Sequence, residues 1–147
     1  MNIILATGIY PPDIGGPATY VRALAEELVK KGNEVRVVTF GGQGRQEGQR
    51  GQQGWEVIAV SRSGGPLMRW WRYAKALRAR GSEADVVIAF SSVSCGVPLW
   101  LAGLKKPKTI LRLGGDFFWE RYTDRGGMKS LREWYESGFL VFGWSGY

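Results

Sequence analysis

The sequence predicts an α/β fold built on a doubly wound parallel sheet. Two observations lead to this expectation: short apolar runs rich in β-branched residues recur along the chain, and segments with helical apolar spacing separate them. Strands joined through helices are expected to run parallel with right-handed crossovers. The 147 residues suit one domain with its own core. We therefore expect a single, Rossmann-like domain with three α/β/α layers.

The expected elements alternate along the chain. Asn2–Thr7 is an apolar run of the kind found in strands buried on both faces. Pro17–Lys31 is the clearest helix, because its apolar residues recur at i, i+3, i+4 and i+7 and Gly32 suits the residue after its last turn. Further strands are expected at Val35–Phe40, Trp55–Val60, Asp85–Phe90, Pro107–Leu113 and Phe139–Phe142, and further helices at Leu67–Arg80, Cys95–Leu104 and Lys129–Glu136.

The composition excludes several classes of site. The chain has no histidine, so the commonest general base and metal ligand are both missing. Its single cysteine, Cys95, excludes an internal disulfide framework and is expected to be an inert packed thiol. The formal net charge of +7 favours anionic ligands or surfaces. Basic residues are scattered and no nucleic-acid-binding motif occurs, so nucleic acid is not an expected partner.

The segment Gly41–Gly54 has six glycines and no apolar residue. It cannot bury surface to offset its ordering entropy, so we expect a mobile loop. It is either a tolerated surface insertion or a flap over a ligand cleft, since it leaves the carboxyl end of a strand.

The connection from Gly8 to Gly16 contains two prolines, Pro11 and Pro12, and two glycines, Gly15 and Gly16, just ahead of Pro17, and a helix needs none of these four residues in order to form. It spans nine residues, whereas such loops usually take about 2–6. One interpretation is a turn into the helix. The other is an anion site, because glycines at a helix start let a phosphate approach free backbone N–H groups. The spacing matches neither a dinucleotide fingerprint nor a Walker loop.

Two stretches resemble a known family. IYPPDIGGPATYVRALAEELVKKGNEVRVVTF, residues 9–40, resembles the amino-terminal signature of family 4 glycosyltransferases, which have the GT-B fold. ILRLGGDFFWERY, residues 110–122, resembles the R-x-x-G-D-x-x-W-E stretch that some members carry. The resemblance covers roughly the whole chain. It implies that residues 1–147 form an amino-terminal, acceptor-side domain, about half of a GT-B enzyme, and that the carboxy-terminal donor domain is absent from this chain.

The resemblance also implies roles for individual residues. Gly15 and Gly16 are expected to face the donor's diphosphate. Asp116 is the catalytic candidate, which orients the acceptor hydroxyl or takes its proton if it lies within hydrogen-bond reach; the alternative is a turn residue or helix cap. Asp13, Arg112 and Glu120 are candidates for the acceptor or sugar side, with a structural ion pair of Arg112 and Glu120 as the alternative.

The resemblance implies a retaining transfer of a hexosyl-type sugar from a nucleotide-sugar to a glycan or lipid-linked acceptor, as in polysaccharide biosynthesis. No cofactor or metal is expected in this domain, and the isolated domain is expected to be inactive without the missing domain, in cis or in trans. The alternative is a non-catalytic Rossmann-like module that binds a nucleotide-sugar, a membrane surface or a partner protein.

The N-terminus has no basic region or cleavage site of a signal peptide, so a cytoplasmic location is expected. The predicted helix Leu67–Arg80 adds an alternative, peripheral contact with the inner membrane face. Its Leu67, Trp70, Trp71, Ala74 and Leu77 are expected on one side and its basic residues Arg69, Arg72, Lys75 and Arg80 mainly on the other. The basic side is either simply solvated or attracted to anionic headgroups.

Overall fold

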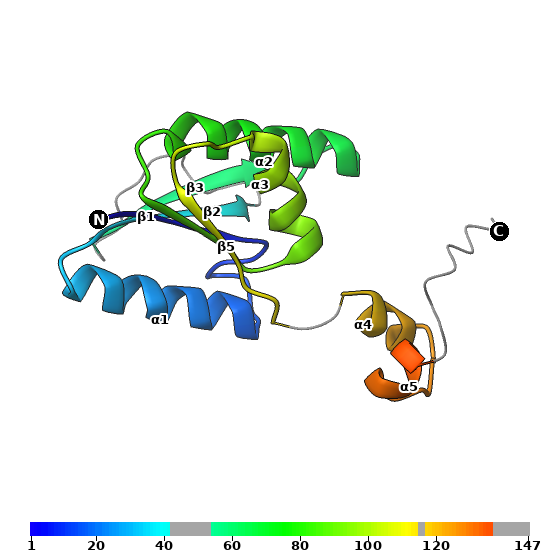
Figure 1. The fold of residues 1–147 in the computed structure, drawn as a ribbon. Helices are drawn as coiled ribbons and strands as arrows, with labels where there is room; N and C mark the ends of the chain where they lie inside the picture. Colours follow the sequence, from blue (N-terminus) through cyan, green and yellow to red (C-terminus); the bar gives the residue numbers. More distant parts are fainter. Residues whose placement is uncertain (42–53, 115–116, 137–147) are drawn as a thin grey trace. The chain divides into compact units, whose positions relative to one another are not determined.

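The computed structural model describes residues 1–41, 54–114 and 117–136, and divides the chain into two compact units, Met1–Gly114 and Gly115–Tyr147 (Figure 1). The first unit holds a parallel sheet and its helices. In chain order its elements are β1 (Asn2–Thr7), α1 (Gly16–Lys30), β2 (Glu34–Gly41), β3 (Glu56–Ser61), α2 (Pro66–Gly81), β4 (Val86–Ala89), the π-helical turn η1 (Ser92–Gly96), α3 (Val97–Ala102) and β5 (Lys108–Leu111).

The five strands of this sheet lie in the order β3-β2-β1-β4-β5, and every neighbouring pair is parallel. The chain runs outward from β1 through β2 to β3, and then returns to β4 on the other side of β1. The order therefore reverses between β1 and β4. In open α/β sheets this switch point, at the carboxyl ends of the strands, is where ligands bind.

The two faces of the sheet carry separate cores. On one face Ile3 and Leu5 of β1 pack with Val21 and Ala25 of α1. On the other face the alternate residue Ile4 packs in a cluster with side chains of α2 and α3. Figure 1 shows α1 on one side of the strands and α2 with α3 on the other. This arrangement confirms the expected Rossmann-like, doubly wound α/β fold.

In the first unit the observed elements follow the expected ones to within a few residues, with one difference at the third helix. The helix expected over Cys95–Leu104 starts earlier, as a π-helical turn over Ser92–Gly96, and α3 ends at Ala102. Ser91 starts this segment because its hydroxyl oxygen accepts a hydrogen bond from the Ser94 N–H at 3.3 Å. Gly103 ends it in the left-handed conformation, φ 59°.

The buried side of α2 differs from the expected one. The structure buries Tyr73, Ala74 and Leu77, whereas Leu67 is 76% and Trp71 59% exposed. Tyr73 takes an inner position because its hydroxyl contacts the main-chain carbonyl oxygens of Val38 and Thr7, at 2.6 and 2.9 Å. Leu67 and Trp71 therefore do not pack in the core with Ala74 and Leu77, although the sequence pattern places them on one side of the helix.

The second unit contributes two helices in its described part. The helix α4 (Phe117–Asp124) was not expected, and α5 (Leu131–Glu136) lies within the helix expected over Lys129–Glu136. Ser130 and Glu133 bond reciprocally at the start of α5, and these hydrogen bonds lower the pKa of the Glu133 carboxyl. The strand expected at Phe139–Phe142 and most of the segment Gly41–Gly54 lie outside the described residues.

Candidate functional site

The candidate site lies at the carboxyl edge of the sheet, beside the switch point between β1 and β4. The connection after β1 and the turn after β4 meet there closely. A side chain at Gly8 would place its Cβ 2.9 Å from the Ser94 hydroxyl oxygen. A side chain at position 8 would therefore require the Ser94 hydroxyl to move.

The long connection from β1 to α1 is anchored at one buried residue. The indole N–H of Trp55 donates to the Tyr10 hydroxyl at 2.8 Å, and both side chains are buried. Asp13 N–H donates to the Tyr10 carbonyl at 3.0 Å, which closes a turn over Pro11 and Pro12. The connection is thus an ordered loop, considerably longer than a turn into the helix needs.

The start of α1 leaves its positive end without compensation from nearby side chains of the helix. Gly15 is the N-cap residue, no side chain caps the helix, and its first turn has no acidic residue. A Cβ at Gly16 would meet no atom within 4 Å, and its φ is not positive. Neither packing nor backbone conformation requires glycine at position 16, and the space beside its Cα is open.

Gly15 has a different reason to be glycine. A Cβ there would lie 2.6 Å from Cδ1 of Ile9, inside the same connection. Position 15 therefore favours glycine through its backbone conformation, φ 159°, and through close packing of the loop on itself, while the open space lies at Gly16.

Arg62 is a site residue that the sequence reasoning missed. It directly follows β3, and its guanidinium donates to Asp13 Oδ2 at 2.7 Å and to the Gly8 carbonyl at 3.4 Å. Both side chains are partly exposed. Arg62 thereby ties the connection after β3 to the connection after β1. Its position after a predicted strand was a usable signal, because the carboxyl ends of parallel strands meet at one edge.

Arg112 follows β5 and rests against aromatic rings. Its guanidinium carbon lies 4.1 Å from the centre of the Tyr20 ring on α1 and 6.0 Å from that of Phe90. The structure thus brings Gly15, Gly16, Asp13, Arg62 and Arg112 to the same edge of the sheet. Asp116 lies outside the described residues. Glu120 falls in α4, but its side chain also lies outside the described part, so neither expected role is tested.

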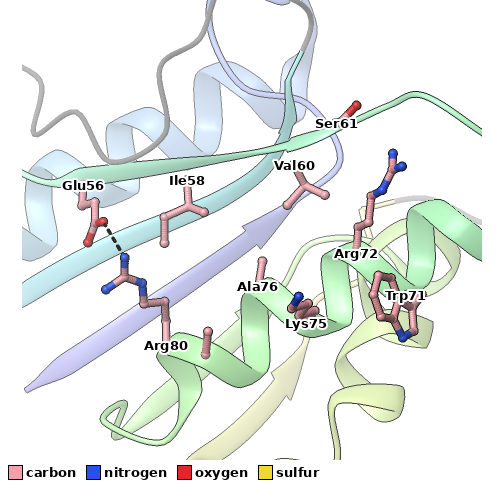
Figure 2. A pocket seen from close by; sticks show the side chains of 10 residues that line it. Glu56, Ile58, Val60, Ser61, Trp71, Arg72, Lys75, Ala76 and Arg80 are labelled. Carbon is pink, nitrogen blue, oxygen red and sulfur yellow. Dashed lines mark ion pairs between the residues drawn. The ribbon is translucent and has the colours of Figure 1, made fainter.

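Hollows of the first unit lie along α2 and α3. A groove of about 690 Å³ runs between β3 and α2, where Arg80 and Glu56 approach to 3.6 Å (Figure 2). A second hollow, of about 330 Å³, lies between α2 and α3. Among the described residues, no group of three His, Cys, Asp or Glu side chains could hold a metal ion. Cys95 is buried, and burial raises the pKa of its thiol.

The fold and this edge define the chain as a Rossmann-like α/β domain with an uncapped helix start at its switch point. A family model described as "Glycosyl transferase 4-like domain" matches residues 15–141. The chain therefore belongs to the glycosyl transferase 4-like domain family, as the resemblance in its sequence indicated.

A solved protein shares the fold. Sucrose-phosphate synthase from Thermosynechococcus elongatus superimposes with a TM-score of 0.64 at 16% sequence identity. The match covers 90% of this chain and 36% of that protein, so the chain spans little more than a third of its length. At this identity the likeness concerns the fold. The search of curated proteins found no match.

Proposed function

We propose that this domain is the acceptor-side half of a retaining glycosyltransferase. The enzyme would move a hexosyl-type sugar from a nucleotide-sugar to a glycan or lipid-linked acceptor, as in polysaccharide biosynthesis. One observation carries the proposal: the uncapped start of α1 at Gly15 and Gly16, open beside the switch point of the sheet. Membership of the glycosyl transferase 4-like family supports it.

The chemistry assigned to this helix start is stabilisation of the donor's diphosphate. When the bond between sugar and diphosphate breaks, negative charge develops on the leaving phosphate oxygens. Backbone N–H groups and the positive end of a helix dipole stabilise such charge without reorganising. Gly16 lets a phosphate approach the backbone closely, and Arg62 fixes the connection through Asp13.

The acceptor side of the proposed site would include Asp13, Arg112 and Glu120. Asp116 remains the proposed catalytic residue, which orients the acceptor hydroxyl or takes its proton. A donor-binding domain, in cis or in trans, would close the site, so the isolated domain would bind donor weakly and turn over little. We propose no metal or cofactor for this domain, and a cytoplasmic location.

The binding site is tested by titrating UDP- and GDP-sugars into the ¹⁵N-labelled chain and following amide shifts by NMR. We expect shifts clustered on Gly15 and Gly16. In Gly16→Ala the added methyl group meets no protein atom, so the fold should be unchanged. Binding should weaken on the order of ten-fold, the loss expected for a hydrogen bond or two to a charged group.

Gly65→Ala is the matched control, because Gly65 is the N-cap of α2 and a Cβ there would also meet nothing within 4 Å. This variant should bind like the unmodified chain. Shifts centred elsewhere, or equal binding by the Gly16→Ala variant, would refute the assignment of the phosphate to α1.

The reaction is tested separately, on the chain joined to a donor-binding domain. Transfer with the donor's anomeric configuration kept in the product supports the retaining assignment, and inversion refutes it. Binding at Gly16 with no transfer to any sugar or lipid-linked acceptor would instead favour the non-catalytic module.

A further inference from the structure

The outer surface between α2 and α3 combines exposed apolar side chains with basic ones. Eight residues line its hollow of about 330 Å³, and we call the six larger ones the α2–α3 patch: Leu67, Trp70, Trp71, Lys75, Arg78 and Leu101. Leu67 and Trp71 are mostly exposed, and Leu101 is 44% exposed. A folded domain thus presents large apolar side chains from two helices around one shallow hollow.

The charge of this surface has one sign. Residues 66–82, which include all of α2, contain five basic residues, Arg69, Arg72, Lys75, Arg78 and Arg80, and no carboxylate. Residues 86–114, which include α3, contain no carboxylate either. The Lys75 ammonium lies 5.5 Å from the centre of the Trp71 ring, so a cation and an exposed apolar ring are neighbours on this surface.

The patch is also held in shape. The Arg78 guanidinium donates to the Ala102 carbonyl at 3.0 Å, which links α2 to the end of α3. Arg72 donates to the Ser63 carbonyl and hydroxyl oxygens, at 3.0 and 2.8 Å. Figure 2 shows Trp71, Arg72 and Lys75 along α2. The basic and apolar side chains therefore lie on a fixed two-helix platform.

We propose that the α2–α3 patch docks on the surface of an anionic lipid bilayer, with Leu67, Trp71 and Leu101 entering the headgroup region and the basic residues facing the phosphates. Tryptophan beside basic residues suits a membrane–water interface, where the ring is half buried and the cations remain hydrated. Among the described residues no helix is long and apolar enough to cross a membrane, so the contact is a peripheral one.

A second copy of the chain fits this surface less well. In a two-fold symmetric dimer the patch would face itself, and Lys75 and Arg78 of one copy would meet the same two cations of the other. A bilayer containing anionic lipids offers opposite charge over the whole area and adapts laterally to the positions of the cations.

The proposed membrane contact is compatible with the proposed function of the domain, but it does not depend on that function. Four residues, 62–65, separate the carboxyl end of β3 from the first turn of α2. The patch therefore begins near the sheet edge that carries Gly16 and Arg62. Docking would bring this edge toward the bilayer, where a lipid-linked acceptor is found.

The test is co-sedimentation of the full chain with phosphatidylcholine vesicles, with and without phosphatidylglycerol. We expect binding only to the vesicles with phosphatidylglycerol, weakened by added salt. Arg69→Gln with Lys75→Gln should lower the partition coefficient roughly 25-fold, since each basic residue near such a surface contributes about five-fold. Leu67→Ser with Leu101→Ser should also lower it.

The matched control is Arg22→Gln with Lys31→Gln, which removes two exposed cations from the α1 side of the sheet. This variant loses the same charge and should bind several-fold more tightly than the Arg69→Gln, Lys75→Gln variant. Every substituted residue is exposed, and circular dichroism checks that each variant folds. Brominated lipid should quench tryptophan emission of the unmodified chain and quench that of Trp71→Phe less.

The proposal is overturned if the chain ignores phosphatidylglycerol vesicles, binds both kinds of vesicle equally, or loses the same affinity in the control as in the patch variants. It is also overturned if the chain self-associates through the patch, so that Leu67→Ser with Leu101→Ser turns a dimer into a monomer while vesicles are not bound.

Discussion

Tyr73 has the largest of the fully buried side chains among the described residues, and it carries a hydroxyl group into the core. Its hydroxyl lies between the carbonyl oxygens of Val38 and Thr7 and 3.7 Å from the Cys95 sulfur. Burial raises the pKa of Tyr73 well above its ordinary value of 10.0, and burial also raises that of the Cys95 thiol from 9.0. The folded chain therefore keeps protons that the unfolded chain releases in alkali.

We predict that the free energy of unfolding falls as pH rises above about 9, by up to about 1.4 kcal/mol per pH unit for each of these two groups. The sign follows from the raised pKa values: the stabilisation is complete below the unfolded-state pKa and is lost above it. Tyr73→Phe should remove part of this slope. At neutral pH the same variant should be less stable by about 1–3 kcal/mol, because two buried carbonyl groups lose a donor.

Urea unfolding at neutral pH and at about pH 10.5 measures both effects. Tyr20→Phe is the control, since Tyr20 is a partly exposed tyrosine of α1 and this variant retains both Tyr73 and Cys95. A Tyr73→Phe variant with an unchanged alkaline slope would contradict the prediction.

The connections between elements, rather than the elements themselves, build the candidate site. Arg62 joins two of them across the sheet edge, through Asp13 and the Gly8 carbonyl. We predict that Arg62→Gln speeds amide hydrogen exchange in residues 8–16. Global stability should fall by less than about 1 kcal/mol, the usual range for a partly exposed ion pair.

Hydrogen exchange followed by mass spectrometry, together with thermal unfolding, checks this prediction. Arg69→Gln is the matched control, because Arg69 donates to the Gly64 carbonyl within its own connection. Its loss should leave residues 8–16 as protected as before. If residues 8–16 of the Arg62→Gln variant are as protected as in the unmodified chain, the Tyr10–Trp55 hydrogen bond keeps the connection ordered without Arg62.

The elements could be predicted because their signals are local. The run Asn2–Thr7 becomes β1 with unchanged bounds, and the β-branched run at Val35–Phe40 becomes the middle of β2. The inner side of α2 could not be predicted from apolar residues alone. Tyr73 outcompetes Trp71 for the core because two main-chain carbonyl oxygens lie within its reach, and those come from β1 and β2.

Part of the candidate site could also be predicted, because part of its signal is local in the sequence. Gly15 and Gly16 are recognisable because glycines preceding a helix have a local meaning, and the structure places them at an open helix start. Arg62 is 49 residues from Asp13 in the sequence, so their pairing depends on the strand order. The exposure of Leu67 and Trp71 likewise depends on where α3 packs.

At the scale of the whole molecule, the first unit contains the described sheet and both of its core clusters. All five strands lie within residues 1–114, and the buried residues of both core clusters fall between Ile3 and Ala102. Outside this unit Trp134 is the one buried apolar side chain among the described residues, and it contacts the Tyr122 ring at 4.3 Å.

We predict that a fragment of residues 1–114 folds alone and unfolds cooperatively. Its thermal midpoint should lie within about 4–8 °C of the full chain's, which corresponds to about 1 kcal/mol for a domain of this size. A fragment of residues 1–90 is the informative control. It lacks Cys95, Leu99 and Ala102, which fill the core beneath α2, and it should show no cooperative transition. Circular dichroism on heating distinguishes the two. If the longer fragment also melts without a transition, residues 115–147 contribute to the stability of the sheet domain, and the two units fold as one.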